Sequence, residues 1–336
     1  MLICPWRMPC LPSVGKFQWK NLLLPLLMLA LGAVGFVSPA QAQNAKAAPK
    51  AQTEKKEKKK EEIPPPEDLN LTTDDGVQLR ATFYPGTKGK DTVPVILLHM
   101  WKGDRNDFKQ LAPYLQSLGH AVLVPDLRGH GESTQVKGMN RPLEADSMPL
   151  RMVDRMVADD METLKRFLMA KHNAGELNIE KLCLVGAELG ASVALDYARL
   201  DWSWPPLATG KQGQDVRALV LISPQWSSHG LSLKAATAHP AVTSELSVYI
   251  VVGKKNSRLV RDAKRLHKIF ERFHPEPPKE ERAEKQDLFI SELPTSLQGT
   301  KMLGVQSLQL ERRIAQFIHL RLVNQTIPWK SREKEF

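Results

Sequence analysis

Residues 77–322 alternate short apolar runs with longer segments of helical spacing, and this alternation constrains the fold more than any other feature of the chain. Runs such as 93–99 (VPVILLH) are almost entirely apolar, which is typical of strands buried on both faces. Strands that alternate with helices form a parallel sheet covered by helices on both sides. The sequence therefore predicts an α/β fold with a mostly parallel, doubly wound sheet. We expect strands over 77–84, 93–99, 121–125, 181–186, 217–222, 246–252 and 287–293, and helices over 107–118, 154–171, 189–199, 259–270 and 307–322.

The first 42 residues have the pattern of an export signal. Basic residues precede an uninterrupted apolar run, 22–37, and the small residues Ala40 and Ala42 follow it. A basic region, an apolar core and a small-residue cleavage site are typical of a secretory signal. We therefore predict a signal peptide over 1–42 and an exported protein, periplasmic or secreted. The alternative is an uncleaved signal that anchors the chain at the outer face of the membrane, with the N-terminal segment as its membrane contact.

Charged segments flank the predicted domain on both sides. Residues 43–66 hold seven lysines and four glutamates and end in three prolines. A stretch of this composition cannot bury enough apolar surface to fold. We predict a disordered Lys/Glu/Pro-rich linker over 43–66, a folded domain over 67–325 and a charged tail over 326–336.

Charge and cysteine content exclude several classes of function. The net charge is +10, but 1–42 and 43–66 each carry +3, which leaves only +4 for the rest of the chain. We see no basic stripe interleaved with aromatic residues, so we expect no nucleic-acid partner. Two of the three cysteines lie within the first ten residues, which excludes a disulfide scaffold and a thiolate zinc site. No His and carboxylate ligands cluster at metal-binding spacing, so we expect no metal and no cofactor.

Two motifs carry a resemblance to a known family. Residues 126–133 (DLRGHGES) follow a predicted strand, and 186–190 (GAELG) lie between a predicted strand and a helix. The first resembles the D-x-R-G-H-G-x-S turn of the α/β-hydrolase superfamily, and the second has the glycine spacing of its nucleophile elbow, G-x-S-x-G. At Gly186 and Gly190 a side chain would collide with neighbouring backbone.

The resemblance covers about residues 67–325. It implies an α/β-hydrolase fold and an activity like that of serine esterases or aminopeptidases, on esters, amides or peptides. Because the segment 224–245 is short, a lid over the sheet is expected to be small or absent. In the first motif, we interpret Asp126, Arg128, Gly129, His130 and Gly131 as residues that brace their loop, with catalysis by Arg128 or His130 as the alternative.

The resemblance also implies three catalytic positions, and the chain departs from the family at each. Glu188 stands at the centre of the elbow, where the family has serine. The position of the triad acid falls on Asn256, and the other place for an acid, 223–226, holds no carboxylate. The histidine position falls on Gln298, and no histidine lies between His274 and His319. An amide cannot act as a general base or stabilise an imidazolium, so we predict a degenerate triad.

The oxyanion hole departs from the family as well. The backbone amide of Leu189 is one expected donor, and the amide of Met100 or Trp101 is the other. The family typically has glycine after this strand, so the bulky side chains of Met100 and Trp101 are expected to narrow the space for a tetrahedral intermediate.

These departures predict a pseudoenzyme that has lost serine-type hydrolysis and acts as a binding or scaffold protein. Its ligand, a small molecule or a protein, is left open. The alternative is an active hydrolase that uses Glu188, or an unrecognised nucleophile, in place of serine. For Glu188 itself two roles remain. It holds a cationic or hydroxyl-rich ligand, or it fills the pocket as a carboxylate paired with Lys102 or Lys254.

Overall fold

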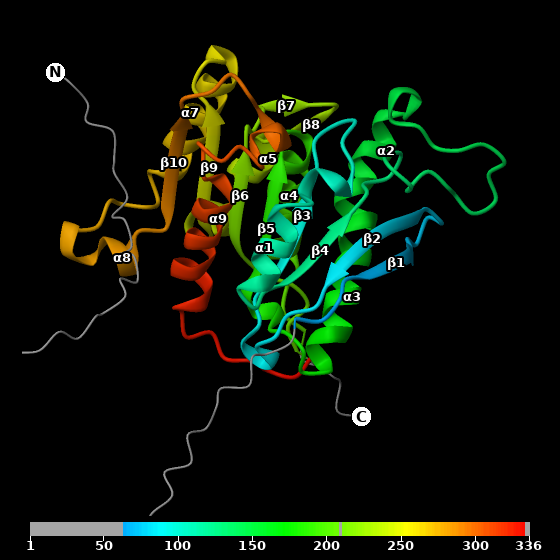
Figure 1. The fold of residues 1–336 in the computed structure, drawn as a ribbon, viewed down its shortest axis with the longest axis horizontal. Coiled ribbons are helices and arrows are strands. Elements are labelled where there is room, and N and C mark those ends of the chain that lie inside the picture. The colour runs from blue at the N-terminus through cyan, green and yellow to red at the C-terminus, as the bar shows by residue number, and fades with distance from the viewer. Residues whose placement is uncertain (1–62, 208–209, 333–336) are drawn as a thin grey trace, which may run out of the picture. The chain divides into compact units, whose positions relative to one another are not determined.

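The computed structural model describes residues 63–207 and 210–332. The predicted signal peptide and most of the predicted linker lie outside these residues. In the described part of the chain, eight strands form one sheet, and helices cover both of its faces (Figure 1). In spatial order the strands are β1 (Glu67–Thr72), β2 (Gln78–Tyr84), β4 (Ala121–Pro125), β3 (Pro94–Leu98), β5 (Leu182–Ala187), β6 (Val216–Ile222), β9 (Ser247–Gly253) and β10 (Leu288–Leu293). The helices are α1 (Leu111–Ser117), α2 (Leu150–Arg155), α3 (Met161–Asn173), α4 (Leu189–Ser203), α5 (Lys234–Thr237), α6 (Pro240–Ser244), α7 (Ser257–Phe270), α8 (Arg282–Lys285) and α9 (Leu310–Ile318).

The sheet is mostly parallel, as predicted. Six strands, from β4 to β10 in spatial order, pair in parallel, whereas β1 and β2 add an antiparallel edge. The chain starts the parallel part at β3, moves outward to β4, and then returns to β5 on the other side of β3. In open α/β sheets, ligands bind at the carboxyl ends of the strands where the order reverses in this way. In this sheet the order reverses at β3 and β5, and we call the region at the carboxyl ends of these two strands the crevice.

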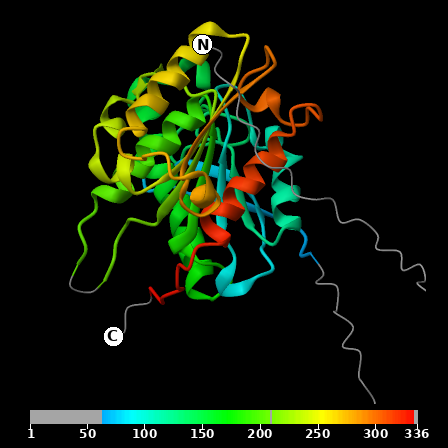
Figure 2. The same cartoon turned by 90° about the vertical axis from the view of Figure 1, so that its left-hand side faces the viewer.

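Two hydrophobic layers hold the helices against the sheet. Successive strand residues point to opposite faces, so Ile96 and Leu98 belong to one layer and Val95 and Leu97 to the other. The first layer also contains the buried side chains of α3, α4 and α7, and the second contains those of α1 and α9. Figure 2 shows the sheet nearly edge-on between these two sets of helices. This sandwich explains the continuous apolar runs of the central strands.

The segment between β6 and β9 is small, as expected for the lid. It consists of a short hairpin of β7 (Ser227–Ser228) and β8 (Leu231–Ser232), followed by α5 and α6. Each of these elements spans five residues or fewer.

The predicted strands are all present, and the differences lie in the helices and at one edge. The helix expected over 154–171 is composite, because a π-helical turn over Met156–Asp160 joins α2 to α3. The helix expected from 307 begins at Leu310 and continues into a second π-helical turn over His319–Val323. The sequence did not predict β1, because this edge strand is half exposed and has no apolar run.

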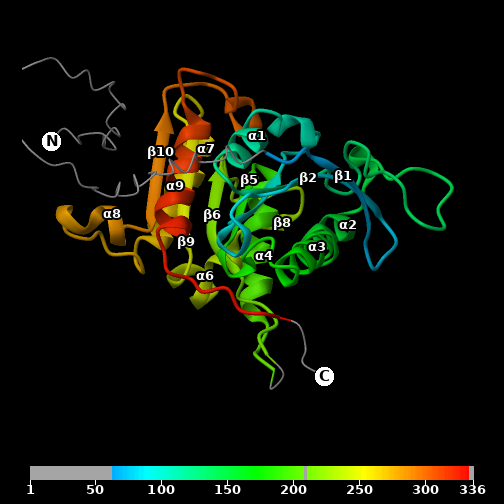
Figure 3. The same cartoon turned by 60° about the horizontal axis from the view of Figure 1, so that its bottom comes forward.

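The C-terminal segment 326–332, assigned to a charged tail from its composition, is bound to the domain. The carbonyl of Ile327 accepts a hydrogen bond from Asn178 Nδ2 (3.0 Å), and the carbonyl of Lys330 lies 2.8 Å from His172 Nε2. Arg332 Nη2 lies 2.8 Å from Glu180 Oε1 and also pairs with Asp215. Figure 3 follows this segment, in red, as it runs from α9 towards α3. The ordered domain therefore extends beyond the expected boundary at 325, to at least residue 332.

Within residues 63–207 and 210–332, no helix combines the length and the hydrophobicity needed to cross a bilayer.

Candidate functional site

Glu188 lies at the sharp turn between β5 and α4, at the carboxyl edge of the sheet. Its backbone has φ 48° and ψ −104°, a conformation that side chains rarely adopt. The Glu188 amide donates a hydrogen bond to the carbonyl of Ile222 (2.9 Å), and its own carbonyl accepts from the amides of Ala191 and Ser192. The turn thus has the strained geometry that exposes a nucleophile in a G-x-S-x-G elbow.

The two motif glycines leave no room for a side chain. A Cβ at Gly186 would lie 2.2 Å from the carbonyl oxygen of Gly190, and a Cβ at Gly190 would lie 2.2 Å from the carbonyl oxygen of Leu98. Both contacts are with backbone, which cannot move aside as the end of a flexible side chain can. This is the collision that the glycine spacing predicts.

The carboxylate of Glu188 is half-buried and closely covered. Gln225 Nε2 donates a hydrogen bond to Oε2 (3.2 Å). Gly299 lies so close that a Cβ built there would sit 3.0 Å from Glu188 Oε1 and 3.0 Å from the sulfur of Met100. Burial raises the pKa of the Glu188 carboxyl, and the charge of Lys301 opposes that shift.

The lysine partners expected for Glu188 do not pair with it. Lys102 forms its ion pair with Asp146 (2.8 Å), and both side chains are exposed, so pairing of Lys102 with Glu188 is wrong. Within residues 63–207 and 210–332, Lys254 forms no ion pair with Glu188 either. The carboxylate instead accepts a hydrogen bond from the neutral side chain of Gln225 and lies close to Gly299.

Gln298, at the histidine position, lies next to this crevice, but the hydrogen bonds of its side chain are with Ser223 and Gly253 and not with Glu188. Its Oε1 accepts hydrogen bonds from Ser223 Oγ (2.8 Å) and from the amide of Gly253 (3.1 Å). Its Nε2 donates to the carbonyl of Gly253 (2.9 Å). The carboxamide therefore joins the ends of β6 and β9, and within the described residues it forms no hydrogen bond with Glu188.

Asn256, at the acid position, is separate from Gln298. It is exposed and caps α7, because its side chain accepts a hydrogen bond from the amide of Leu259 (3.1 Å). Ser223, which follows β6, is the residue that contacts Gln298, and its Oγ also accepts from the amide of Gly299 (2.9 Å). Of the three predicted positions, the structure thus brings Glu188 and Gln298 together and leaves Asn256 apart.

The two bulky residues after β3 line the other side of the crevice. The sulfur of Met100 and Oε1 of Glu188 would each lie 3.0 Å from a Cβ at Gly299, so both side chains border this glycine. Trp101 stacks on His229 of the β7–β8 turn, with ring centroids 3.9 Å apart, and meets His130 edge-on at 4.9 Å. Leu189, whose amide is the other expected oxyanion donor, is the first residue of α4 and is buried. The aromatic contacts of Trp101 bring the small lid down onto the end of β3.

The carboxylate of Asp126 stabilises the turn 126–133 through hydrogen bonds to backbone amides. Asp126 Oδ1 accepts from the amide of Arg105 (2.7 Å), and its Oδ2 accepts from the amide of Glu132 (2.9 Å). A Cβ at Gly131, where φ is +50°, would lie 2.4 Å from Asp126 Cγ, so only glycine fits. Gly129 also has a positive φ, +74°.

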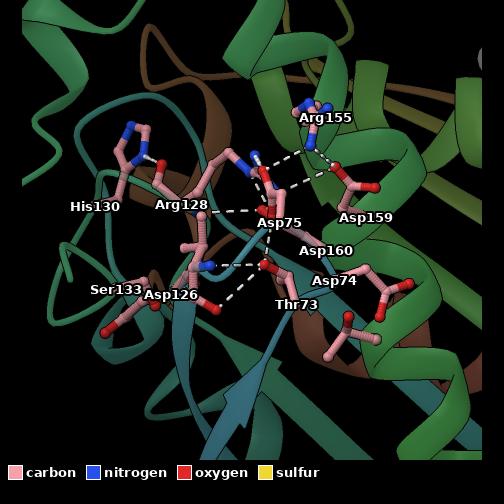
Figure 4. Close-up of polar contacts among 12 residues, drawn as sticks. Thr73, Asp74, Asp75, Asp126, Arg128, His130, Ser133, Arg155, Asp159 and Asp160 are labelled. Atoms are coloured by element: carbon pink, nitrogen blue, oxygen red, sulfur yellow. Dashed lines mark hydrogen bonds and ion pairs between the residues drawn. The ribbon is translucent and has the colours of Figure 1, made fainter. Parts of the chain in front are cut away.

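Arg128 is fully buried and connects the turn to two other parts of the chain (Figure 4). It pairs with Asp160 of the π-helical turn (2.5 Å) and with Asp75 of the β1–β2 turn (2.8 Å). Burial raises the pKa of Asp160 to about 6 against the effect of Arg128. Burial acts to raise the pKa of Asp75 as well, but the hydrogen bond from Arg128 and other contacts hold it at about 2.

His130 is buried beside Arg128. Its Nδ1 lies 2.9 Å from the carbonyl of Arg128. Burial lowers the pKa of its imidazole to about 4. The contacts of Asp126 and Arg128 are with the frame around the loop and favour the bracing interpretation, whereas His130 also meets Trp101 beside the crevice.

Sequence reasoning missed three residues of the site. Ser223 and Gln225 were passed over because neither is charged, although they follow β6, where the family can place its acid. His229 lies in the lid turn and has no motif around it. The positive φ of Ser223 (52°) and His229 (48°) is visible only in the structure. Among the described residues, no group of three or more His, Cys, Asp or Glu side chains is arranged to hold a metal ion.

The fold and the elbow together define the class of protein. A family model described as alpha/beta hydrolase fold matches residues 93–272. This match includes the turn 126–133 and the elbow, and it spans more than half of the chain. The chain belongs to the α/β-hydrolase fold family.

Curated relatives match only part of the chain. An uncharacterised protein of Mycobacterium tuberculosis is 26% identical over 136 residues, which are 40% of this chain and 42% of the relative. The sn-1-specific diacylglycerol lipase of Danio rerio is 29% identical over 130 residues, which are 38% of this chain and 33% of the lipase. The matches therefore span less than half the length of these relatives.

Solved structures match a larger share. An esterase of Pyrococcus furiosus superposes with a TM-score of 0.54 at 14% identity, covering 77% of this chain and 91% of the esterase. A thermostable carboxyl esterase of Bacillus coagulans superposes with a TM-score of 0.54 at 10% identity, covering 76% of this chain and 99% of that enzyme. At these identities the likeness shows the fold alone.

Proposed function

We propose that this chain is a non-catalytic member of the α/β-hydrolase fold family that acts as a binding or scaffold protein. One observation carries the proposal. The side chain at the histidine position, Gln298, is a carboxamide held by Gly253 and Ser223, and no histidine within the described residues is hydrogen bonded to Glu188. Hydrolysis by this architecture needs a base beside the elbow that accepts a proton at neutral pH.

The surroundings of Glu188 support a filled crevice. Gly299 and the sulfur of Met100 lie close to the carboxylate, and Gln225 donates a hydrogen bond to it. A tetrahedral intermediate would need this same space, next to the amide donors at the end of β3 and the start of α4. These surroundings favour a Glu188 side chain that fills the pocket over one that binds a cationic ligand.

A second function is favoured by one specific property of Glu188. Its backbone has the strained φ of 48° that exposes a nucleophile at the elbow of this family, and a carboxylate can act as a covalent nucleophile. In that case the chain is a hydrolase of esters, amides or peptides in which Glu188 attacks the substrate. A group other than histidine must then activate the water that releases the product.

Hydrolysis of a substrate panel separates the two functions. The full chain and Glu188→Gln are assayed with short-chain esters and aminoacyl substrates, because Gln keeps the shape of the side chain and removes its charge. We expect equal rates for both proteins, at the level of buffer alone. Saturable turnover that Glu188→Gln abolishes would establish the hydrolase and overturn the non-catalytic proposal.

We propose export on the pattern of residues 1–42, and N-terminal sequencing of the protein from cells tests it. A mature chain that begins at Gln43 supports a cleaved signal. A chain that keeps 1–42 and remains in the cytoplasm contradicts export.

A further inference from the structure

The region of α7 carries a larger net positive charge than the folded domain as a whole. Between residues 254 and 272 the chain has eight Lys or Arg residues and two acids, a surplus of +6. The whole of 67–336 has a surplus of only +4, so the remainder of the domain is net negative. The positive charge is thus concentrated on one helix and its two ends.

Four of these cations lie on one side of α7, and two more lie just beyond its ends. At about 100° per residue, positions spaced by three or four residues fall on the same face. The six residues, which we call the α7 cationic face, are Lys254, Arg258, Arg261, Arg265, Lys268 and Arg272, and all six are exposed. The opposite side of α7 packs into the core through Leu259, Ala263, Leu266 and Phe270.

The structure leaves this face almost without acidic partners. Lys264, on its flank, pairs with Glu292 (2.9 Å), and Arg265 stacks on Trp226 at 3.4 Å from the ring centroid. Asp262 accepts a hydrogen bond from the amide of Trp226 (3.2 Å). Among the described residues, the other five members of the face form no ion pair. Like charges placed three or four residues apart repel one another, so this arrangement favours an external anionic partner.

The chemistry of the face identifies the kind of partner. Within α7 the row runs from Arg258 to Lys268, about 15 Å at 1.5 Å per residue, and Lys254 and Arg272 lie just beyond the two ends of the helix. The row includes no Asn or Gln from Ser257 to Arg272, and these are the side chains that read base edges in nucleic acid together with Arg. Phe273, which is 51% exposed, adds an apolar ring beside Arg272. A row of Lys and Arg on a helix with an apolar residue at its end is typical of binding to an anionic lipid surface.

We propose that the α7 cationic face binds the surface of a membrane that contains anionic phospholipid. The inference goes beyond the proposed function and does not rest on it, because the face contains none of the residues of the Glu188 crevice. Binding at this surface would place the domain with α7 against the headgroups and leave the opposite layer, with α1 and α9, facing away.

Sedimentation with vesicles tests the proposal on the full chain. Binding is compared between vesicles of phosphatidylcholine and vesicles of phosphatidylcholine mixed with phosphatidylglycerol. The readout is the ratio of the two affinities, which removes any contribution of the apolar segment 22–37. The test variant is Arg258→Gln/Arg261→Gln/Lys268→Gln. The control, Lys109→Gln/Arg141→Gln/Arg151→Gln, removes the same charge from exposed residues elsewhere.

We expect the full chain and the control to prefer anionic vesicles, and the α7 variant to lose about 100-fold of that preference at low salt. High salt should abolish the preference of the unmodified chain, a result that needs no variant to fold. Equal binding to both vesicles, or equal loss in both variants, would overturn the proposal. So would tighter binding to RNA than to anionic vesicles, because the face would then be a nucleic-acid surface.

Discussion

The hydroxyl of Ser223 lies 2.8 Å from Oε1 of Gln298, although the two residues are 75 positions apart in the chain. Ser223 follows β6 and Gln298 follows β10, so the contact joins the two places where the family can hold an acid and a histidine. In place of a charged hydrogen bond between an acid and a histidine, the chain has an uncharged hydrogen bond between a serine hydroxyl and a carboxamide. The pair can stabilise the loop after β10, but it cannot move a proton at neutral pH.

This contact predicts which substitutions would rebuild a triad. In Glu188→Ser/Gln298→His/Ser223→Asp the new carboxylate faces the new imidazole, whereas Asn256→Asp would place it on an exposed helix cap. We expect the variant with Ser223→Asp to hydrolyse short-chain esters at least about 10-fold faster than the variant with Asn256→Asp, because an oriented acid contributes up to about 10⁴ in rate. The measurement is the initial rate on a chromogenic ester. Faster hydrolysis by the Asn256→Asp variant would contradict the assignment of the acid position.

The strained turn at Glu188 predicts an unusual gain in stability. Replacing Glu188 with Gly relieves a backbone with φ 48° and ψ −104°, a conformation that costs about 1–3 kcal/mol for a residue with a side chain. Glu188→Ala is the matched control, since it removes the carboxylate and keeps the Cβ. We expect Glu188→Gly to unfold in denaturant with a free energy about 1 kcal/mol above that of Glu188→Ala, after the entropy of glycine is allowed for. A less stable glycine variant would show that the turn is not strained.

Buried histidines predict a loss of stability in mild acid. Burial lowers the pKa of His120 and of His130 from 6.5 to about 4. The unfolded chain binds protons at both side chains near pH 6.5, so their contribution is present above that pH and is lost as the pH falls to about 4. Asp160 acts in the opposite direction, because its pKa is raised to about 6 and its contribution is lost as the pH rises through that value.

Two histidines outweigh one carboxyl, so the net effect is destabilising. We expect the free energy of unfolding to fall by about 3 kcal/mol between pH 7 and pH 4, at about 1.4 kcal/mol for each unit of pKa shift. Denaturant titrations at several pH values measure it. In His130→Gln the slope of stability against pH should become shallower. An unchanged slope would show that His130 is protonated at the same pH in both states.

The bound C-terminal segment predicts that Arg332 stabilises the domain. Its guanidinium pairs with Glu180 and with Asp215, whose side chain is fully buried. Arg332→Ala should lower the free energy of unfolding by about 1–2 kcal/mol, because it removes one partner of a buried carboxylate that keeps its ion pairs with Lys165 and Lys211. The control is Arg312→Ala, since Arg312 is exposed. Equal stability of the two variants would mean that residues 326–332 do not hold the fold.

Much of the fold follows from local features that a sequence displays. The runs 93–99 and 121–125 are apolar because they pass through the middle of the sandwich, and they match β3 and β4 to within a residue or two. The elbow was also predictable, because Gly186 and Gly190 are required by backbone contacts within a few residues and at the neighbouring strand. The edge strand β1 was not, because Leu69 and Leu71 are its only apolar residues, and so short an alternation does not distinguish a strand from a loop.

The contacts that define the site depend on long-range packing. The hydrogen bond between Ser223 and Gln298 joins two loops, and the pairs formed by Arg332 join the end of the chain to the region of β6. Polar side chains in such positions look like solvated loop residues in a sequence. The partner of Lys102 could not be predicted for the same reason, since it is Asp146, in the loop before α2, and not Glu188 of the nearby elbow.

The central claim is that the Glu188 crevice does not catalyse hydrolysis. The most direct measurement is kcat/KM for the ester and aminoacyl panel, with the full chain, Glu188→Gln and Glu188→Ser/Gln298→His/Ser223→Asp in one assay. The rebuilt variant shows that the substrates can reach the crevice. We predict that the first two proteins match buffer alone and that only the rebuilt variant turns over. A full chain that exceeds Glu188→Gln on any substrate of the panel would contradict the account.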